Sequence, residues 1–217
     1  MVSRLVLALC LSLGQAAGMA MVPGAAFADT YSARLTKAIA DLTVRAEVRT
    51  GYSRDLFPHW TDADGDGCST RHEVLIAEAV EPPSVGDGCA LRGGRWFSYY
   101  DRVSWTDIGR IDVDHLVPLA EAWDSGARRW RPRTRRAYAN DLGDRRSLVG
   151  VTDSVNQSKG DRDPDEWMPA FGTCRYVREW VAVKHRWRLE VNRAERRALA
   201  SFASGCRNRK VTVTLAR

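Results

Sequence analysis

The chain has 217 residues, with 33 Lys and Arg against 27 Asp and Glu, so its formal net charge is +6 at pH 7. This length is enough for one domain with a real hydrophobic core. Beyond the N-terminal segment no stretch is apolar enough to cross a membrane, which excludes a span in the mature chain. The modest positive charge alone is weak evidence for a nucleic-acid partner, since many secreted proteins are basic.

The N-terminal segment has the three parts of a secretory signal peptide. Arg4 is a short basic start, LVLALCLSLG is an apolar run too short to span a membrane comfortably, and Ala26-Phe27-Ala28 fits a small-x-small cleavage site. We expect cleavage after Ala28, which removes residues 1–28 and leaves one secreted domain at residues 29–217. An uncleaved anchor is the alternative, but the apolar run ends early at Gly14-Gln15.

Four cysteines remain once Cys10 leaves with the leader, an even number that suits disulfides in an oxidising compartment. Three pairings are open to them. We favour Cys68–Cys89 and Cys174–Cys206, because each bond closes a local unit. Zinc is the alternative for four cysteines, but no C-x-x-C spacing is present.

Residues 31–50 are predicted to form an amphipathic helix with a packing role, since Leu35, Ile39, Leu42 and Ala46 recur at helical spacing. The acidic segment that follows, TDADGDGCSTRHEV, fits the calcium loop D-x-[DN]-x-[DN]-G-x₅-E and precedes a predicted helix at residues 70–79. The alternative is an acidic turn that caps this helix, because Pro58 interrupts the expected entering helix. The calcium ligands would be Asp62, Asp64, Asp66, the Cys68 carbonyl, Thr70 and Glu73.

The middle of the chain reads as short strands joined by loops. Residues 81–94 are rich in Pro and Gly and are predicted to be a loop, whereas GRWFSYYDRVSW has strand-like aromatic content. Residues 112–115 alternate like a strand that ends before Pro118. The helix after Pro118 is expected to end near Ser125-Gly126 and to turn inward Leu119, Ala122 and Trp123.

A second short strand at residues 145–151 precedes a helical turn that opens at Asp153 or Ser154 and carries Asn156 and Lys159. Further on, residues 176–184 make a clear helix. Asn192 with Glu195 resembles a capping box that opens a last helix, ending near Ser204. Three other histidines are assigned structural or surface roles: His59, His72 and His185.

Eight arginines lie between residues 128 and 146, and the commoner meaning of such a run is a solvated face. Here the run lies between the candidate residues His115 and Asn156, which favours contact with nucleic-acid phosphates. The predicted phosphate contacts are Arg128, Arg129, Arg133, Arg136 and Lys159.

Four residues are the candidates for chemistry: Asp114, His115, Asn140 and Asn156. Asp and Asn oxygens suit Mg²⁺, and a neutral His can take a proton from an attacking water, so this set suits phosphodiester hydrolysis. Adjacent strand residues point to opposite faces. Asp114 and His115 can therefore share a site only if the strand end is bent or the metal lies off its edge.

The order Asp-His, Asn, Asn-x-x-Lys resembles the HNH motif, or ββα-metal finger, and D-x-D-H-[hydrophobic]-V-P resembles the HNH domain of CRISPR RNA-guided nucleases. The longer pattern DVDHLVPLAEAWDSGA, YANDL, NQSKGDRDPDEWMP and CRYVREWVAVKHRWRL resembles the secreted actinobacterial HNH endonucleases, relatives of the C-terminal nuclease domain of GmrSD-type restriction enzymes. This resemblance covers roughly residues 55–199. It implies His115 as general base, Asp114 and Asn156 as metal ligands, and Asn140 as a brace for the loop bearing His115.

The resulting expectation is one mainly helical α+β domain with an inserted ββα-metal finger at about residues 111–161. Its expected function is that of a secreted, monomeric endonuclease that uses Mg²⁺, or alternatively Mn²⁺, to cut DNA with low sequence specificity. The resemblance implies 5′-phosphate and 3′-hydroxyl ends. Two alternatives stay open: a metal-dependent ribonuclease or phosphodiesterase, and a non-catalytic calcium-binding surface module.

Overall fold

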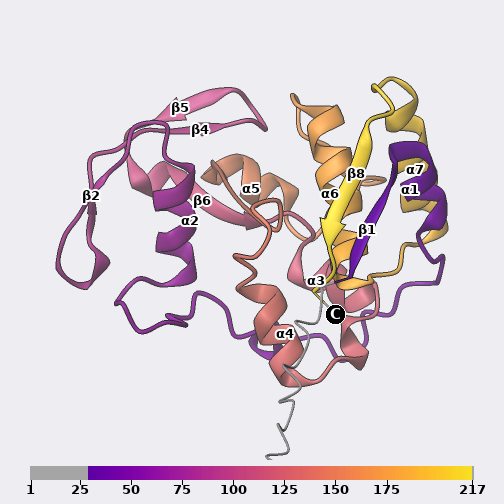
Figure 1. Ribbon diagram of the computed structural model, residues 1–217, viewed down its shortest axis with the longest axis horizontal. Coiled ribbons are helices and arrows are strands. Elements are labelled where there is room, and N and C mark those ends of the chain that lie inside the picture. The colour runs from indigo at the N-terminus through magenta and orange to yellow at the C-terminus, as the bar shows by residue number, and fades with distance from the viewer. Residues whose placement is uncertain (1–28, 217) are drawn as a thin grey trace, which may run out of the picture.

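The two ends of the described chain form one small sheet, seen at the right of Figure 1. The computed structural model describes residues 29–216, so the expected leader at residues 1–28 lies outside the described residues. Strand β1 (Thr30–Arg34) pairs antiparallel with β8 (Lys210–Thr214). Val211 and Val213 alternate with exposed neighbours and are buried, which turns one face of β8 onto the helices. No helix in this part of the chain is long and apolar enough to cross a membrane.

The main core is built around α6 (Thr173–Trp187), which packs against both β8 and α7 (Arg193–Ser204). Tyr176, Val177 and Trp180 are fully buried, since apolar residues recur at helical spacing along α6. The predicted cap of α7 is present, because Asn192 Oδ1 accepts hydrogen bonds from the first turn. Three shorter helices contribute to the same core: α1 (Leu35–Asp41), α3 (Leu119–Asp124) and α4 (Pro132–Ala139).

A smaller core lies between α2 (Thr70–Glu78) and the central strands, where Val74 and Leu75 pack with Trp96 and Val113. This helix confirms the prediction for residues 70–79. The aromatic segment folds as a hairpin, and the predicted loop at 81–94 contains a second one. These hairpins are β4 (Trp96–Ser98) with β5 (Val103–Trp105), and β2 (Ser84–Val85) with β3 (Leu91–Arg92). Short 3-10 helices lie at Arg54–Leu56, Asp87–Cys89, Ile108–Arg110 and Ala127–Arg129.

The centre of the molecule carries two antiparallel strands and a helix in the order strand, strand, helix (Figure 1). Strand β6 (Ile111–His115) pairs with β7 (Leu148–Thr152), and α5 (Asp153–Lys159) follows β7 directly. Both predicted strands and the predicted helical turn are therefore confirmed. The described residues, 29–216, form a single mixed α+β domain, mainly helical, as the sequence predicts.

The predicted helix at residues 31–50 is wrong over most of its length. Its first residues form β1, because they pair with β8 at the far end of the chain. The helix α1 ends at Asp41, after which the chain is extended so that the Arg45 N–H donates to the Val191 carbonyl, 2.9 Å away. Both departures come from hydrogen-bond partners distant in sequence, which local periodicity does not reveal.

Both disulfides have the predicted pairing. Cys68–Cys89 joins the start of α2 to the end of the β2–β3 turn, with Cα atoms 5.0 Å apart. Cys174–Cys206 joins the first turn of α6 to the residue after the α7 C-cap, with Cα atoms 5.5 Å apart. Each bond closes a local unit and ties an irregular segment to a helix.

Candidate active site

Three of the four predicted chemical residues line one cavity of about 200 Å³ between β6 and α5: Asp114, His115 and Asn156. Arg54 lines it as well. Asp114 and His115 are neighbours at the end of β6, and both are buried. The conflict between strand alternation and a shared site is thus resolved by the position of the cavity, which lies at the end of the strand.

His115 is enclosed by aromatic rings and is only 6 % exposed. Its ring stacks at 5.1 Å from the Trp60 ring, and the His59 ring lies 6.2 Å away. The structural role predicted for His59 is compatible with this place beside His115, where its Nδ1 also lies 2.9 Å from the Phe57 carbonyl. His59 and Trp60 precede the acidic loop and reach His115 only through the fold, so no sequence spacing indicates this contact.

The burial of His115 keeps its imidazole neutral, and a hydrogen bond to a backbone carbonyl selects its tautomer. Desolvation lowers the pKa of His115 to about 3, against a weaker raising effect from its hydrogen bond to Ala139. The Ala139 carbonyl lies 2.9 Å from Nε2 and can only accept, so Nε2 carries the proton. Nδ1 is then the nitrogen with a free lone pair, and His115 is prepared to accept a proton there.

Asp114 is held by two donors inside the domain. Its Oδ2 accepts the Tyr100 hydroxyl at 2.7 Å, and its Oδ1 accepts the Lys159 ammonium at 2.8 Å. Lys159 also donates to the His115 carbonyl at 3.0 Å and is 0 % exposed. Burial raises the pKa of Asp114, and Lys159 opposes that rise. The prediction that Lys159 contacts phosphate is therefore wrong: its charge is buried and paired with Asp114.

Asn156 brings a second acidic residue to the site. Its amide nitrogen donates to Asp112 Oδ2 at 3.1 Å. Asp112 and Asp114 are two residues apart on β6 and so share a face, which meets Asn156 and Lys159 on α5. Asp112 was not among the predicted site residues, although the alternation along IDVDH could have indicated it.

The donors around the cavity fit a hard divalent cation. Asp114 and Asn156 offer oxygen atoms to one space, and Asp112 lies beside Asn156. Each Asp114 oxygen accepts one hydrogen bond and keeps a second lone pair. Oxygen donors from carboxylate and amide groups are those that Mg²⁺ and Mn²⁺ prefer.

Asn140 does not line this cavity and braces the structure behind it. Its Oδ1 accepts the Thr61 N–H and the Thr70 hydroxyl, each at 2.9 Å, and its amide donates to the carbonyls of Pro58 and Arg136. The preceding residue, Ala139, accepts the His115 ring hydrogen. Asn140 thus holds the end of α4 against residues 58–61, and so positions His115 through the backbone.

The four arginines predicted to contact phosphate do not line the cavity. Arg129 pairs with Glu190 at 2.9 Å, Arg128 Nη1 is buried, and Arg133 and Arg136 line other hollows of the surface. Contact of these four arginines with phosphate therefore stays a prediction, at places outside the cavity. Arg54 does line the cavity, from a segment some sixty residues before the motif.

Three carboxylates gather in the acidic loop before α2. Oxygens of Asp62, Asp64 and Asp66 lie within 4.8 Å of one another. Burial raises the pKa of Glu73, and the three aspartates raise it further. The Cys68 sulfur is in the disulfide, so this residue can offer its carbonyl but no thiolate.

Residues 89–202, just over half of the chain, match the family model described as GmrSD restriction endonucleases, C-terminal domain. The chain belongs to this family. The matched GmrSD-type region contains β6, β7 and α5, and so all the residues that line the cavity except Arg54. The family points to a nuclease, and a nuclease binds nucleic acid.

A curated protein described as an uncharacterized secreted protein, from Arthroderma benhamiae, is 43 % identical to the chain over 171 residues. The alignment covers 77 % of this chain and 82 % of that protein. The description of this relative and the two disulfides fit an extracellular location. No solved structure matches the GmrSD-type chain.

Proposed function

We propose that this protein is a secreted, metal-dependent endonuclease of the HNH type that hydrolyses phosphodiester bonds in DNA with low sequence specificity. One observation carries the proposal. The fold brings a neutral His115 and the oxygen donors of Asp114 and Asn156 to a single cavity, inside a strand–strand–helix unit. Low specificity follows because the chain has no separate base-reading motif.

In the proposed mechanism His115 Nδ1 takes the proton of a water molecule, which attacks the phosphorus in line with the leaving oxygen. Lys159 holds the Asp114 carboxylate and the His115 carbonyl together, so it fixes both residues without touching the substrate. Arg54 can contact a phosphate oxygen at the edge of the cavity. A divalent cation, held by Asp114 and Asn156, supplies charge stabilisation for the phosphate when bound.

The products expected from this mechanism are a 5′-phosphate and a 3′-hydroxyl. Because the mechanism needs no 2′-hydroxyl, RNA is the alternative substrate, and Mn²⁺ is the alternative to Mg²⁺. A non-catalytic calcium-binding module is the other alternative. The oxygen donors of Asp114 and Asn156, which line the same cavity as His115, favour the enzyme over this module.

The test is to incubate the mature protein with supercoiled plasmid and with RNA, with each divalent metal or with EDTA. We expect plasmid cleavage with Mg²⁺ or Mn²⁺ and none with EDTA. Analysis of the ends checks the 5′-phosphate. No cleavage of either substrate with any metal would reject the endonuclease and leave the surface module.

We also propose that the loop from Asp62 to Glu73 binds Ca²⁺ for stability and not for chemistry. The loop packs several carboxylates close together before α2, a flexible oxygen cage of the kind that suits Ca²⁺. The donors at the cavity are fewer and suit Mg²⁺. The two metals therefore have separate effects.

Calcium is expected to raise the Tm of the wild type without supporting cleavage. At about 100 times the dissociation constant, binding stabilises the fold by about 2.7 kcal/mol, or about 5–10 °C for a domain of this size. Asp64→Ala with Asp66→Ala should abolish the shift, whereas the matched loss of two exposed carboxylates in Asp165→Ala with Glu166→Ala should keep it. Calorimetry with and without calcium measures this. If calcium leaves the Tm of the wild type unchanged, the loop serves only as an acidic cap of α2 and the calcium site is rejected.

A further inference from the structure

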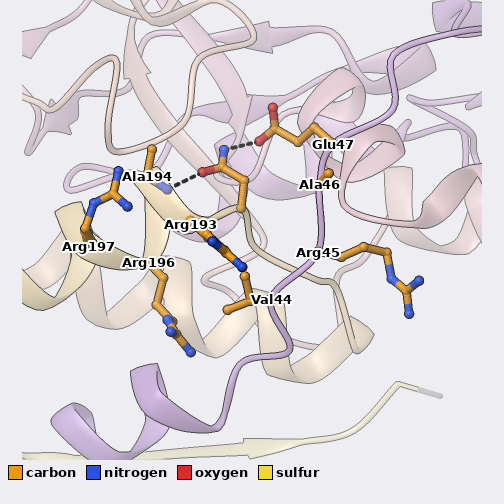
Figure 2. A pocket seen from close by; sticks show the side chains of 9 residues that line it. Val44, Arg45, Ala46, Glu47, Arg193, Ala194, Arg196 and Arg197 are labelled. Atoms are coloured by element: carbon orange, nitrogen blue, oxygen red, sulfur yellow. Dashed lines mark hydrogen bonds between the residues drawn. The ribbon is translucent and has the colours of Figure 1, made fainter.

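A basic groove of about 1200 Å³ runs along the start of α7 and shares no lining residue with the cavity of His115. Figure 2 shows its wall: Arg193, Arg196 and Arg197 project from α7, and Arg45 lies across from them. Glu47 is the acidic residue of the lining, and the Asn192 amide holds its carboxylate.

The three α7 arginines are not neutralised by the protein. By contrast, Arg45 on the other side of the groove already pairs with Glu190, 2.7 Å away. Arg193, Arg196 and Arg197 are exposed, and within residues 29–216 none of them has an ion pair or a side-chain hydrogen bond. They lie at the positive end of the α7 dipole, which disfavours cations. An anion bound between the three arginines would offset the repulsion between their charges and the positive end of the helix dipole.

One segment of chain connects the groove to the cavity. Arg45 lines the groove, and Arg54, nine residues later, lines the cavity. Between them Arg49 pairs with Asp161, another residue of the cavity wall, at 3.6 Å. Nine residues reach at most ~30 Å even when fully extended. That distance equals about nine base pairs, at about 3.4 Å for each step of a strand, so the groove and the cavity lie within the length of one short duplex.

We propose that this groove binds the phosphodiester backbone of the substrate duplex on one side of the cut. The proposal rests on the proposed nuclease function. Arginine suits the task because its planar guanidinium donates two parallel hydrogen bonds to a phosphate. The groove contacts backbone and not base edges, in keeping with cleavage of low sequence specificity.

The test measures binding of a fluorescent 30-base-pair duplex by the mature protein, in EDTA and over a range of salt concentrations. In Arg193→Gln/Arg196→Gln/Arg197→Gln the affinity should fall about tenfold or more at low salt, and the log–log salt slope should flatten by about 2–3. The control removes three exposed cations beyond the other end of α7, in Arg207→Gln/Arg209→Gln/Lys210→Gln. It should bind like the wild type.

Equal log–log salt slopes for the triple arginine variant and the wild type would overturn the proposal that the groove binds the duplex. So would loss of binding to phosphatidylserine vesicles without loss of duplex binding, which would assign the arginines to a membrane surface. The readout needs no cleavage. A wild type that binds the duplex through the groove but cuts nothing would reject the endonuclease and keep the groove.

Discussion

Replacing His115 with alanine is expected to lower the cleavage rate by about two to four orders of magnitude, the usual contribution of a general base. The physical reason is the neutral ring, whose Nε2 is committed to the Ala139 carbonyl and whose Nδ1 can accept the proton of water. Steady-state cleavage of plasmid with Mg²⁺ measures the effect. Circular dichroism of the variant checks that the domain remains folded.

His185→Ala is the matched control for this prediction. The His185 ring also hydrogen-bonds a backbone carbonyl, that of Ala38 at 2.8 Å, but it stacks on Tyr31 and does not line the cavity. We expect this variant to lose some stability and to cut at nearly the wild-type rate. A folded His115→Ala protein with wild-type activity would remove His115 from the mechanism.

Replacing Lys159 with methionine is expected to destabilise the fold by about 3–5 kcal/mol, because it leaves the buried carboxylate of Asp114 without its cation. The Tyr100 hydroxyl remains as a donor to this carboxylate but brings no charge. Urea denaturation of wild type and variant measures the difference. Activity should fall as well, since Lys159 also holds the His115 carbonyl.

Two further variants distinguish this explanation from a simple loss of packing. Asp114→Asn combined with Lys159→Met removes both charges, so it should be less destabilised than the sum of the single variants. Lys37→Met removes an exposed cation from its pair with Asp41 and should have a much smaller effect. Additive losses in the double variant would mean that the ion pair is not the cause.

Much of the candidate site was predictable because it is local in the sequence. Alternation in IDVDH places the strand and the Asp114–His115 pair, and the turn at Asp153 places Asn156 and Lys159 on the following helix. The resemblance of the ordered motif then suggests the chemistry. The disulfides were predictable for the same reason, since each closes a short unit.

What the sequence by itself determined is therefore the family, the strand–strand–helix unit and the identity of the residues that could do chemistry, because short-range periodicity and motif order carry that information. Only the tertiary structure decided the surroundings of these residues. It buried Lys159 as the partner of Asp114, and it brought Arg54 and Trp60 to the site from a distant segment. It also turned the first predicted helical residues into β1, because strand pairing with β8 satisfies their backbone hydrogen bonds across the whole length of the chain.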